Sequence, residues 1–391
     1  MSEKRLPYAR VGIVGAGQLG LMLCDAARRL GIATCVLDAD SDSPAFVRAD
    51  EAIVGDRFDP QALRKLAAAS DVITFEIEHA DTETLADLQA SGTAVRPSAT
   101  VLDTVRDKWR QRAALERAGV PGPNALLWSE EGDDSSPADA PLDPPFVQKL
   151  RFGGYDGRGV KIIRLEDDKP LPGASLVEEL VDIRCEVAVL VARTPSGQEL
   201  AYPPVRMEFD PEANICTRCL LPAGLKSDVA ERCRTVAIEA VRALGAVGIC
   251  AVELFVTGDG RVLVNELAPR PHNSGHLTIE ASATGQFEQH LRAILDLPLG
   301  SVDTVRAAVM VNVLGGDSTG SPAVSGYEEL LALPEAHLHL YDKRPSKPGR
   351  KMGHLTVCAG RLEGAVEIAG RAEALFRLNG HSADRREHGT R

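Results

Sequence analysis

The sequence contains no apolar run that approaches the roughly 20 residues needed for a membrane-spanning helix. Its N-terminal residues, MSEKRLPYAR, lead toward a strand without the apolar stretch of a signal peptide. It also has no excess of positive charge, since the net charge is -12 at pH 7, and this argues against bulk attraction to nucleic acid or anionic membranes. We therefore expect a cytoplasmic protein that binds small molecules but neither nucleic acid nor membrane.

Eight cysteines are present, but only Cys216 and Cys219 form a C-x-x-C pair. A structural zinc site would require two further ligands at close spacing, and the sequence has no second pair. Most of the other cysteines lie in apolar segments, which is typical of buried thiols rather than of a disulfide framework. We interpret Cys216 and Cys219 as alternate residues of a strand, with zinc binding or redox chemistry as the alternative.

Length and patterning predict several α/β units. With 391 residues, 44% of them hydrophobic and 26% charged, the chain is long enough for two or three globular domains. Strands alternate with helices over residues 1–105, which predicts a doubly wound parallel sheet. Residues 106–300 carry further strands and helices, and the alternation in 301–391 predicts a small β-rich domain. The polar, proline-rich stretch 129–145 is expected to be a mobile surface loop rather than a boundary.

The motif GAGQLG, residues 15–20, follows the first strand and opens the first helix. With Asp38 at the end of the next strand, it has the outline of a dinucleotide-binding fingerprint, and this makes an NAD-binding oxidoreductase an alternative function. The pattern is weak alone, because such glycines require only a tight turn and close helix packing. Other ligands also bind at the carboxyl ends of parallel strands, so Gln18 and Leu19 are candidate ligand contacts.

Two glutamates, Glu76 and Glu78, lie at the end of the apolar strand in DVITFEIE. Side chains two residues apart on a strand point the same way. We expect Glu76 to accept hydrogen bonds from ligand hydroxyl groups. Two solvated side chains at a strand end are the alternative.

A glycine-rich segment, KLRFGGYDGRGV at residues 149–160, predicts a phosphate-binding loop. Glycine lets backbone amides approach phosphate oxygens, and Lys149 and Arg158 add positive charge. The segment lacks the G-K-[ST] ending of a Walker loop, so it would be a phosphate-binding loop of another type. A plain glycine hairpin is the alternative. We expect residues 153–159 to form a mobile lid. The residues at its tip, Tyr155 and Asp156, are expected to contact a second substrate as well.

The segment LVEELVDIRCE, residues 176–186, ends an apolar strand with acidic residues. A strand edge beside an adenine can offer backbone N–H and C=O groups to it, and a nearby acid can bind the ribose hydroxyls. Alone, this segment does not indicate a function. The residues concerned are Glu178, Glu179, Leu180, Val181 and Glu186.

The hairpin sequence ICAVELFVTGDGRVLVNEL carries the strongest physical argument for a metal. A two-residue loop at Gly258–Asp259 would place Glu253 opposite Val264. Glu266 would then share a face with Glu253 as a diagonal partner roughly 7–8 Å away. Two glutamates on one face of an apolar hairpin repel each other and are costly to bury, and a divalent cation such as Mg²⁺ between them relieves both effects. Two solvated glutamates on an outer face are the alternative.

The polar stretch APRPHNSGH follows this hairpin directly, and its two prolines restrict the backbone. The guanidinium of Arg270 can bind a planar anion such as bicarbonate through two parallel hydrogen bonds, and His272 and Asn273 add donors. The stretch therefore predicts a binding site for a small anion. A buried arginine–glutamate pair beside a core histidine is the alternative.

A basic loop near the C-terminus, YDKRPSKPGRK, contrasts with the acidic character of the whole chain. Its glycine and prolines make it rigid, which favours binding of a phosphate monoester over a solvated charged surface. The candidate phosphate ligands are Lys343, Arg350 and Lys351.

Together these motifs resemble the ATP-grasp superfamily and, within it, the N5-carboxyaminoimidazole ribonucleotide synthase family. The segments GAGQLG, TFEIE, GGYDGRG, VNELAPRPHNSGH and PGRKMGHL occur in this order in the family, and the resemblance covers nearly the whole chain. It implies an α/β protein with an ATP-grasp fold. An N-terminal preATP-grasp domain with a doubly wound parallel sheet would span 1–105, the ATP-grasp domain 106–300, and a small β-rich C-terminal domain 301–391. It also implies a homodimer.

The resemblance implies the chemistry as well. In the family, MgATP phosphorylates bicarbonate to carboxyphosphate, and the amine of 5-aminoimidazole ribonucleotide then takes up the carboxyl group in purine biosynthesis. The products are N5-carboxyaminoimidazole ribonucleotide, ADP and phosphate. The implied cofactors are ATP and Mg²⁺, with Mn²⁺ as a substitute, and bicarbonate is the co-substrate. An ATP-grasp ligase with a different acceptor and an inactive nucleotide-binding scaffold are the alternatives.

Motif by motif, the resemblance also implies residue roles. ATP would be held by Lys108, Lys149, the loop Gly153, Gly154, Tyr155, Asp156, Gly157, Arg158 and Gly159, the segment Glu178, Glu179, Leu180 and Val181, and Glu186, Asn265 and Glu266. The metal would bind Glu253 and Glu266, and bicarbonate or carboxyphosphate would bind Arg270, His272 and Asn273. The aminoimidazole ribonucleotide would contact Gln18, Leu19, Glu76, Tyr155, Asp156, Lys343, Arg350 and Lys351. Lys108 stands where some members have an arginine, which keeps the charge but loses the forked geometry.

Overall fold

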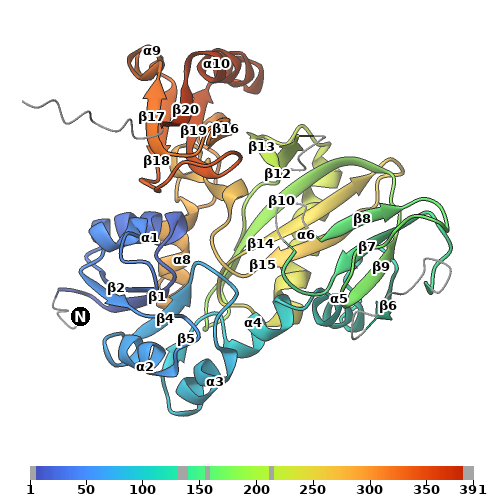
Figure 1. Cartoon of the computed structure of the whole chain (residues 1–391), viewed down its shortest axis with the longest axis horizontal. Coiled ribbons are helices and arrows are strands. Elements are labelled where there is room, and N and C mark those ends of the chain that lie inside the picture. Colours follow the sequence, from blue (N-terminus) through green and yellow to red (C-terminus); the bar gives the residue numbers. More distant parts are fainter. Residues whose placement is uncertain (1–5, 130–139, 155–158, 211–214, 382–391) are drawn as a thin grey trace, which may run out of the picture.

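The computed structural model describes residues 6–129, 140–154, 159–210 and 215–381 (Figure 1). Its N-terminal unit is a five-stranded sheet in the order β3-β2-β1-β4-β5, and every pairing in it is parallel. This confirms the predicted doubly wound sheet. The elements are β1 (Arg10–Val14), α1 (Gln18–Arg29), β2 (Ala33–Asp38), η1 (Pro44–Val47), β3 (Glu51–Val54), α2 (Pro60–Ala68), β4 (Val72–Phe75), α3 (Thr82–Ala90), β5 (Ala94–Val95) and α4 (Ala99–Val105).

Helices cover both faces of this sheet. Helices α2, α3 and α4 pack against one face, where Leu63, Leu85 and Leu102 join one apolar cluster. On the other face α1 packs together with α8 (Gln286–Ile294), which comes from much later in the chain. The side-by-side position of α1 and α8 is visible in Figure 1. The N-terminal sheet is therefore completed by a helix of the following unit.

The second unit begins with α5 (Lys108–Arg117) and an antiparallel four-stranded sheet in the order β6-β9-β7-β8. Asp107 caps α5, because its side chain accepts hydrogen bonds from the N–H groups of Trp109 and Arg110. The strands are β6 (Ala125–Ser129), β7 (Phe146–Leu150), β8 (Val160–Ile163) and β9 (Ser175–Glu179). Of the predicted surface loop 129–145, residues 130–139 lie outside the described residues.

A larger antiparallel sheet runs through the second unit and into the third, in the order β15-β14-β10-β12-β13-β16-β19-β18, with β11 beside β10. Strand β13 pairs with β16, so the sheet is continuous across the predicted division at residue 300. Its strands are β10 (Ile183–Arg193), β11 (Glu199–Ala201), β12 (Val205–Phe209), β13 (Cys216–Leu221), β14 (Gly248–Thr257), β15 (Val262–Ala268), β16 (Ala307–Leu314), β18 (Ala336–Leu340) and β19 (Lys351–Ala359).

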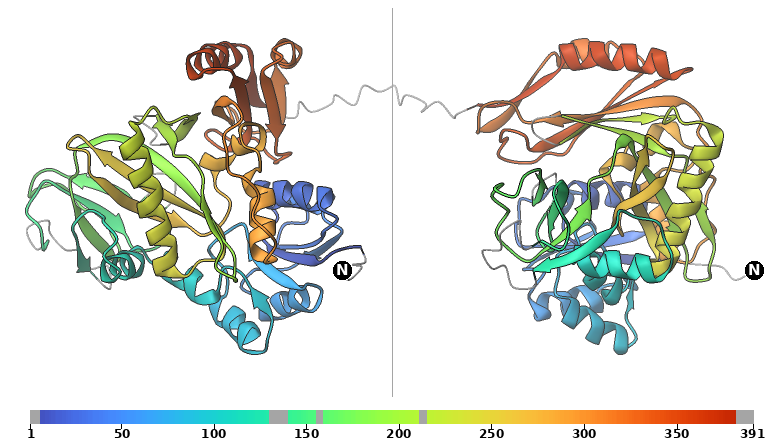
Figure 2. Two further views of the ribbon diagram at one scale, coloured as in Figure 1. Left: turned by 180° about the vertical axis from the view of Figure 1, so that it is seen from behind. Right: turned by 90° about the vertical axis from the view of Figure 1, so that its right-hand side faces the viewer.

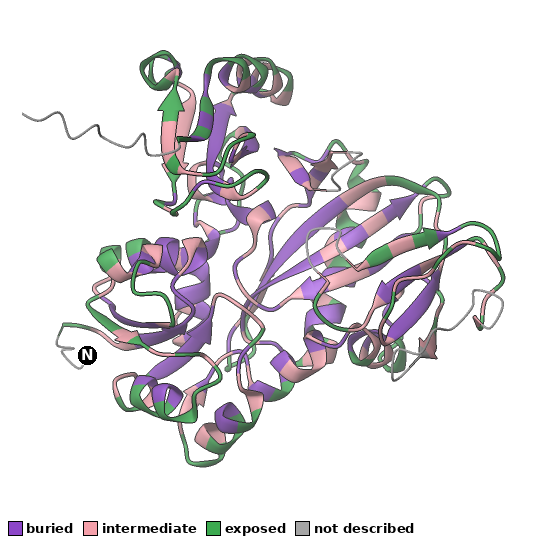
Figure 3. Ribbon diagram, viewed as in Figure 1, coloured by how far each residue is buried: buried purple, intermediate pink, exposed green. Residues whose placement is uncertain are grey.

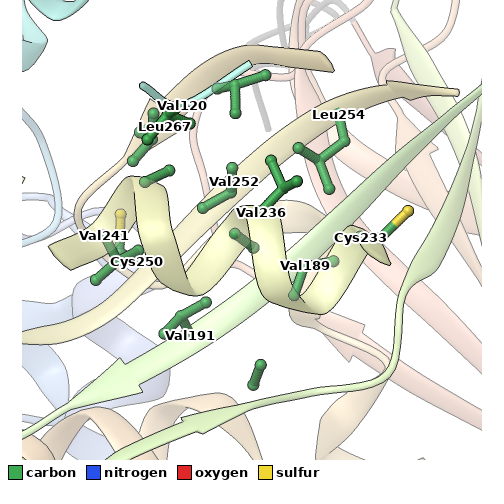
Figure 4. Packing of buried hydrophobic residues seen from close by; sticks show 14 of the residues in the cluster. Val120, Val189, Val191, Cys233, Val236, Val241, Cys250, Val252, Leu254 and Leu267 are labelled. Atoms are coloured by element: carbon green, nitrogen blue, oxygen red, sulfur yellow. The ribbon is translucent and has the colours of Figure 1, made fainter. Parts of the chain in front are cut away.

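Helix α6 (Ser227–Leu244) buries one face of this sheet and ends, as predicted, at Gly245 in the left-handed region. Figure 4 shows Val236 and Val241 of α6 packed against Val252 and Leu254 of β14. Successive strand residues alternate between faces, so the residues between these, including Glu253, lie on the opposite face. The strands beneath α6 are the most buried part of the unit (Figure 3). Packing of α6 thus decides which face of β14 remains for ligands.

The third unit adds helices to the predicted β-rich pattern. Helix α10 (Leu362–Leu375), which was not predicted, packs on β16 and β19 and forms the outer layer of this unit (Figure 2). The remaining elements are η3 (Asn273–Gly275), α7 (Thr278–Ala281), β17 (Ser321–Ser325), α9 (Tyr327–Leu331) and β20 (Arg377–His381). Among the helices within the described ranges, none is long and apolar enough to cross a membrane.

Candidate active site

A β-bulge in β15 sets the geometry of the two metal-ligand candidates, Glu253 and Glu266, which we call the carboxylate pair. Leu254 pairs with Val264, but Glu253 pairs with Glu266, so Asn265 is an extra residue on β15. The predicted pairing of Glu253 with Val264, and the two-residue loop on which it depended, are therefore wrong. The hairpin turn is longer than predicted, and the two glutamates are direct rather than diagonal partners.

The bulge explains how both glutamates come to lie on the ligand face. Val262 and Val264 pack in the core under α6, and regular alternation would turn Glu266 toward that core as well. Because the bulge shifts the alternation by one residue, Leu267 enters the core instead. Asn265 then reaches the site: its Nδ2 lies 3.4 Å from an oxygen of Glu253.

Burial and neighbouring charges make the carboxylate pair electrostatically costly. Burial, with the added charges of Glu266 and Glu186, raises the pKa of Glu253 to about 8. Burial also acts to raise the pKa of Glu266, but the charges of Lys108 and Lys149 outweigh it, and the pKa is lowered. Lys108 forms an ion pair with Glu266. The face therefore holds three close carboxyl groups and two lysines, an arrangement that one added cation would relieve.

Arg112 is a buried residue of this site that was not predicted. Its Nη2 lies 3.1 Å from Oε1 of Glu178, and Nζ of Lys149 lies 2.6 Å from Oε2 of the same carboxylate. Burial acts to raise the pKa of Glu178, but these two cations lower it overall. Lys149 also donates to Oδ1 of Asn265 at 2.9 Å. The available signal was the i, i+4 spacing of Lys108 and Arg112, which places both on one face of α5.

Part of the segment proposed to run beside an adenine lies inside a sheet. β9 lies between β6 and β7, so the backbone of Glu178 and Glu179 belongs to the interior of a sheet and not to an edge. The side chain of Glu179 also points away from Lys149, because its Oε1 accepts a hydrogen bond from the N–H of Asn124 at 3.1 Å. Only Leu180 and Val181, which follow β9, remain outside the strand.

The glycine-rich loop is described in part. Gly153 and Gly159 both have positive φ, at 73° and 78°, the backbone region that glycine adopts at low cost. Gly154 lies beside Gly159, because a Cβ added to Gly159 would be 3.3 Å from the Cα of Gly154. The remaining candidates of this loop, Tyr155, Asp156, Gly157 and Arg158, lie outside the described residues.

The polar stretch Ala268–His276, which we call the anion loop, follows β15 and meets the carboxylate pair. Nε2 of His272 lies 3.5 Å from Oε1 of Glu253, and its Nδ1 is 2.8 Å from the hydroxyl of Ser274. Nε of Arg270 lies 2.8 Å from Oε1 of Glu78. Nδ2 of Asn273 is buried and has no hydrogen-bond partner among the residues that the structure describes. A buried donor left unpaired is expected where a ligand supplies the acceptor.

The glycine turn GAGQLG is occupied by a side chain of the protein itself. The carboxylate of Glu76 accepts hydrogen bonds from the N–H groups of Gly17 and Gly20, the latter at 2.6 Å. It thus sits at the N-terminus of α1, where a dinucleotide fold would bind pyrophosphate. Asp38 is also engaged locally, accepting from the N–H of Ala16 at 2.9 Å. The glycines serve the approach of Glu76, which removes the basis for the NAD alternative.

Replacing Gly17 by alanine is expected to lower the free energy of unfolding by about 1–3 kcal/mol, the range for overpacking a filled site. A Cβ at Gly17 would lie 2.6 Å from an oxygen of Glu76. Gly370→Ala in α10 is the control, because its Cβ would meet nothing within 4 Å and alanine favours a helix. Urea denaturation of both variants measures the difference. Equal stability of the two would contradict the close approach of Glu76.

The basic loop of the third unit faces the N-terminal unit. Burial raises the pKa of Glu76, and the positive charge of Lys343 is close enough to oppose this shift. Lys351 opens β19, and Nη1 of Arg350 donates to the carbonyl of Pro345 at 2.6 Å. Gln18 opens α1 and lies partly exposed at the glycine turn. The side chain of Leu19 is 6% exposed and packs in the core, so only its backbone can meet a ligand.

Cys216 and Cys219 both lie in the strand β13, as predicted, but they are three residues apart and are not alternate residues of it. β13 is irregular opposite β12, and the two sulfur atoms are 3.7 Å apart. The contact with Cys216 and burial raise the pKa of the Cys219 thiol. Within the described ranges, no group of three or more histidine, cysteine, aspartate or glutamate side chains is arranged to hold a metal ion. Cys216 and Cys219 therefore give no support to the alternative of a zinc site.

Comparison with known proteins identifies all three units. Residues 8–106 match the ribonucleotide synthetase preATP-grasp domain, residues 113–287 match the ATP-grasp domain, and residues 308–367 match the phosphoribosylaminoimidazole carboxylase C-terminal domain. The chain is 43% identical over 360 residues to the N5-carboxyaminoimidazole ribonucleotide synthase of Mycobacterium tuberculosis, covering 88% of this chain and 82% of the relative.

Solved structures agree with this. The N5-carboxyaminoimidazole ribonucleotide synthetase of Thermotoga maritima superposes with a TM-score of 0.87 at 40% identity, covering 95% of this chain and 100% of that one. The synthase of Aspergillus clavatus, in complex with ADP and 5-aminoimidazole ribonucleotide, superposes with a TM-score of 0.85 at 33% identity and covers 94% and 98% of the two chains. The ATP-grasp fold inferred from the motifs is thereby confirmed.

Proposed function

Because this chain belongs to the N5-carboxyaminoimidazole ribonucleotide synthase family of ATP-grasp ligases, we propose that the carboxylate pair and the anion loop carry out the ATP-dependent carboxylation of 5-aminoimidazole ribonucleotide with bicarbonate. A bicarbonate oxygen attacks the γ-phosphorus of ATP, and ADP leaves. The nitrogen of the ribonucleotide amine then attacks the carboxyl carbon of carboxyphosphate, the bond from this carbon to the phosphate oxygen breaks, and the proton lost by the amine leaves with the phosphate. The observation that carries the proposal is the contact between the two parts: His272 of the anion loop lies 3.5 Å from Glu253.

The carboxylate pair fits a divalent cation. Two opposed carboxyl groups with an amide beside them match the donor set of Mg²⁺, which takes one or two protein carboxylates and completes its shell with phosphate oxygens and water. Burial and the charges of Glu266 and Glu186 raise the pKa of Glu253, and a cation bound between the two carboxyl groups would oppose this shift. When bound, Mg²⁺ neutralises the charge of the β- and γ-phosphates. Mn²⁺ has the same ligand preference and is expected to substitute.

The ATP phosphates are placed between α5 and the glycine loop. Lys149 is held in position by Glu178 and Asn265, and Lys108 lies at Glu266, so both ammonium groups border the carboxylate pair. Because they are fixed before ATP arrives, little side-chain freedom is lost on binding. Leu180 and Val181 provide the backbone N–H and C=O groups that bind the adenine. Glu186 is assigned to the nucleotide because the family resemblance implies it.

The anion loop is proposed to hold bicarbonate and carboxyphosphate. Arg270 offers the fork for a planar anion, and the unpaired Nδ2 of Asn273 adds a donor. The ribonucleotide lies between Glu76, Gln18 and the basic loop, with its phosphate on Lys343, Arg350 and Lys351. The pairing of two chains into a homodimer and the division of the chain near residues 105 and 300 are parts of the same proposal.

ADP release in a coupled assay tests the function. With MgATP and bicarbonate, adding 5-aminoimidazole ribonucleotide is expected to stimulate ADP release strongly, and omitting bicarbonate is expected to abolish the stimulation. Catalysis here is positioning and charge neutralisation, so each substrate must be present to complete the site. ADP release that is indifferent to the ribonucleotide would retain ATP-grasp chemistry but reject this acceptor.

A further inference from the structure

Gln286, the first residue of α8, directs both the oxygen and the nitrogen of its side-chain amide to the anion loop. Its Oε1 accepts from the N–H of His272 at 2.9 Å, and its Nε2 donates to the carbonyl of His272 at 2.8 Å. Nε2 also lies 3.0 Å from Nδ1 of His276. The side chain is 0% exposed, so water does not compete for these bonds. We propose that Gln286 is a positioning residue that sets the orientation of His272 for bicarbonate and carboxyphosphate.

The bonds from Gln286 join the backbone of His272 to α8. Proline at 269 and 271 supplies no backbone N–H, and the N–H of Arg270 donates to the carbonyl of Ala268 at 2.8 Å. The carbonyl of His272 also accepts from the N–H of Gly275 at 3.0 Å, within the loop itself. Gly275 allows the close approach, because a Cβ there would lie 2.5 Å from Oε1 of Gln286. Gln286 is itself held by Thr278, whose hydroxyl oxygen accepts a hydrogen bond from the backbone N–H of Gln286 at 2.9 Å. The amide thus fixes the backbone on both sides of the His272 side chain.

His272 lies beside other residues that are proposed to bind the anion. Its ring lies between Ser274 and Glu253, and Asn273 with its unpaired Nδ2 is the next residue. A rotation of the His272 backbone would therefore move two anion donors relative to the carboxylate pair. Displacements of about 1 Å at a reacting centre cost on the order of 100-fold in rate. This inference rests on the proposed function, since it concerns the same anion site.

The chain contains a matched control one turn further along α8. Gln289 is also 0% exposed. Its Oε1 accepts from the N–H of Gly300 at 2.8 Å, and its Nε2 donates to the carbonyl of Gly300 at 2.8 Å. It therefore makes the same double hydrogen bond to a backbone, but to a loop outside the site. Methionine at either position keeps the length of the side chain and removes these bonds.

The test compares Gln286→Met with Gln289→Met in unfolding and in steady-state kinetics. Both variants are expected to unfold at similar, lowered urea midpoints. Only Gln286→Met is expected to lower kcat about 100-fold, raise the KM for bicarbonate and release more ADP per molecule of carboxylated ribonucleotide, while the KM for ATP stays within about twofold. Gln289→Met should keep the wild-type ratio of ADP to product.

Gln286→Glu provides a second variant should the methionine variant not fold. It keeps the acceptor for the His272 N–H but loses the donor to the carbonyl, so an intermediate defect is expected. Equal kinetic losses in Gln286→Met and Gln289→Met, or wild-type coupling in the Gln286 variants, would overturn the positioning role. If the wild-type protein itself shows no stimulation of ADP release by the ribonucleotide, the proposed function fails, whatever the variants do.

Discussion

Replacing Glu266 by glutamine is expected to lower turnover at least about a thousand-fold, because a divalent cation at this site supplies several kcal/mol of charge stabilisation. The amide keeps the shape of the side chain but loses the charge that faces Glu253 across the two strands. Folding should survive with reduced stability, since the repulsion from Glu253 is removed but the ion pair of Glu266 with Lys108 is lost. Thermal unfolding is expected to remain cooperative, with ADP release as the measure of turnover.

Glu199→Gln is the control for this variant. Glu199 also lies in the large sheet as an ion-paired glutamate, with Arg193 at 3.0 Å and Arg242 at 2.6 Å, but its strand β11 is remote from the carboxylate pair. Near-normal turnover in this variant would show that a change of charge in the sheet is harmless by itself. Near-normal turnover of Glu266→Gln, under the same conditions, would contradict the metal assignment.

The strand and helix pattern of the N-terminal unit was predictable because it is local. Apolar runs such as RVGIV and DVITF alternate with amphipathic helices, and this alternation favours a parallel sheet, although it does not fix the order of the strands. The same local reasoning found α6, with Asp228 in its first turn and Gly245 at its end. It could not find that α8 covers the N-terminal sheet, because that contact joins segments far apart in the chain.

The carboxylate pair shows where sequence reasoning placed two glutamates on one face of the hairpin, as the structure has them, but through the wrong geometry. Counting from a two-residue loop gave a diagonal pair on a regular strand. The extra residue, Asn265, is what turns Glu266 away from the core that receives Val264. A bulge has no simple sequence signal when the extra residue is not glycine, since its cause is the packing of Leu267 under α6.

For Glu76, sequence reasoning missed the contact that joins this residue to the glycine motif. Its carboxylate was expected to meet ligand hydroxyls, and the glycine motif was considered separately as a weak dinucleotide fingerprint. The structure joins the two, because Glu76 bonds to Gly17 and Gly20 across a separation of more than fifty residues. Only the parallel pairing of β1 with β4 brings the strand ends together, and pairing between strands is what a single sequence specifies least.

Replacing Arg270 by lysine is expected to lower kcat/KM for bicarbonate about 100-fold while the KM for ATP changes little, because lysine keeps the charge but cannot form the planar fork. Nε of Arg270 lies 2.8 Å from Oε1 of Glu78 as an ion pair, and Nη1 donates to the carbonyl of Pro271 at 3.1 Å. An ammonium group cannot reproduce both contacts and also present two parallel donors. Bicarbonate-dependent ADP release measures the effect.

Arg292→Lys separates this loss of the fork from a loss of structure. Arg292 likewise contacts one glutamate and one carbonyl, with Nη2 on Glu288 at 2.5 Å and Nη1 on the carbonyl of Pro298 at 3.4 Å, and its side chain is also partly buried. It lies on α8 outside the anion loop, so its lysine variant should keep wild-type kinetics. If both lysine variants lost bicarbonate dependence equally, the loss would come from weakened packing around arginine. If neither did, charge alone would suffice at Arg270, and the anion would be held chiefly by Asn273 and His272.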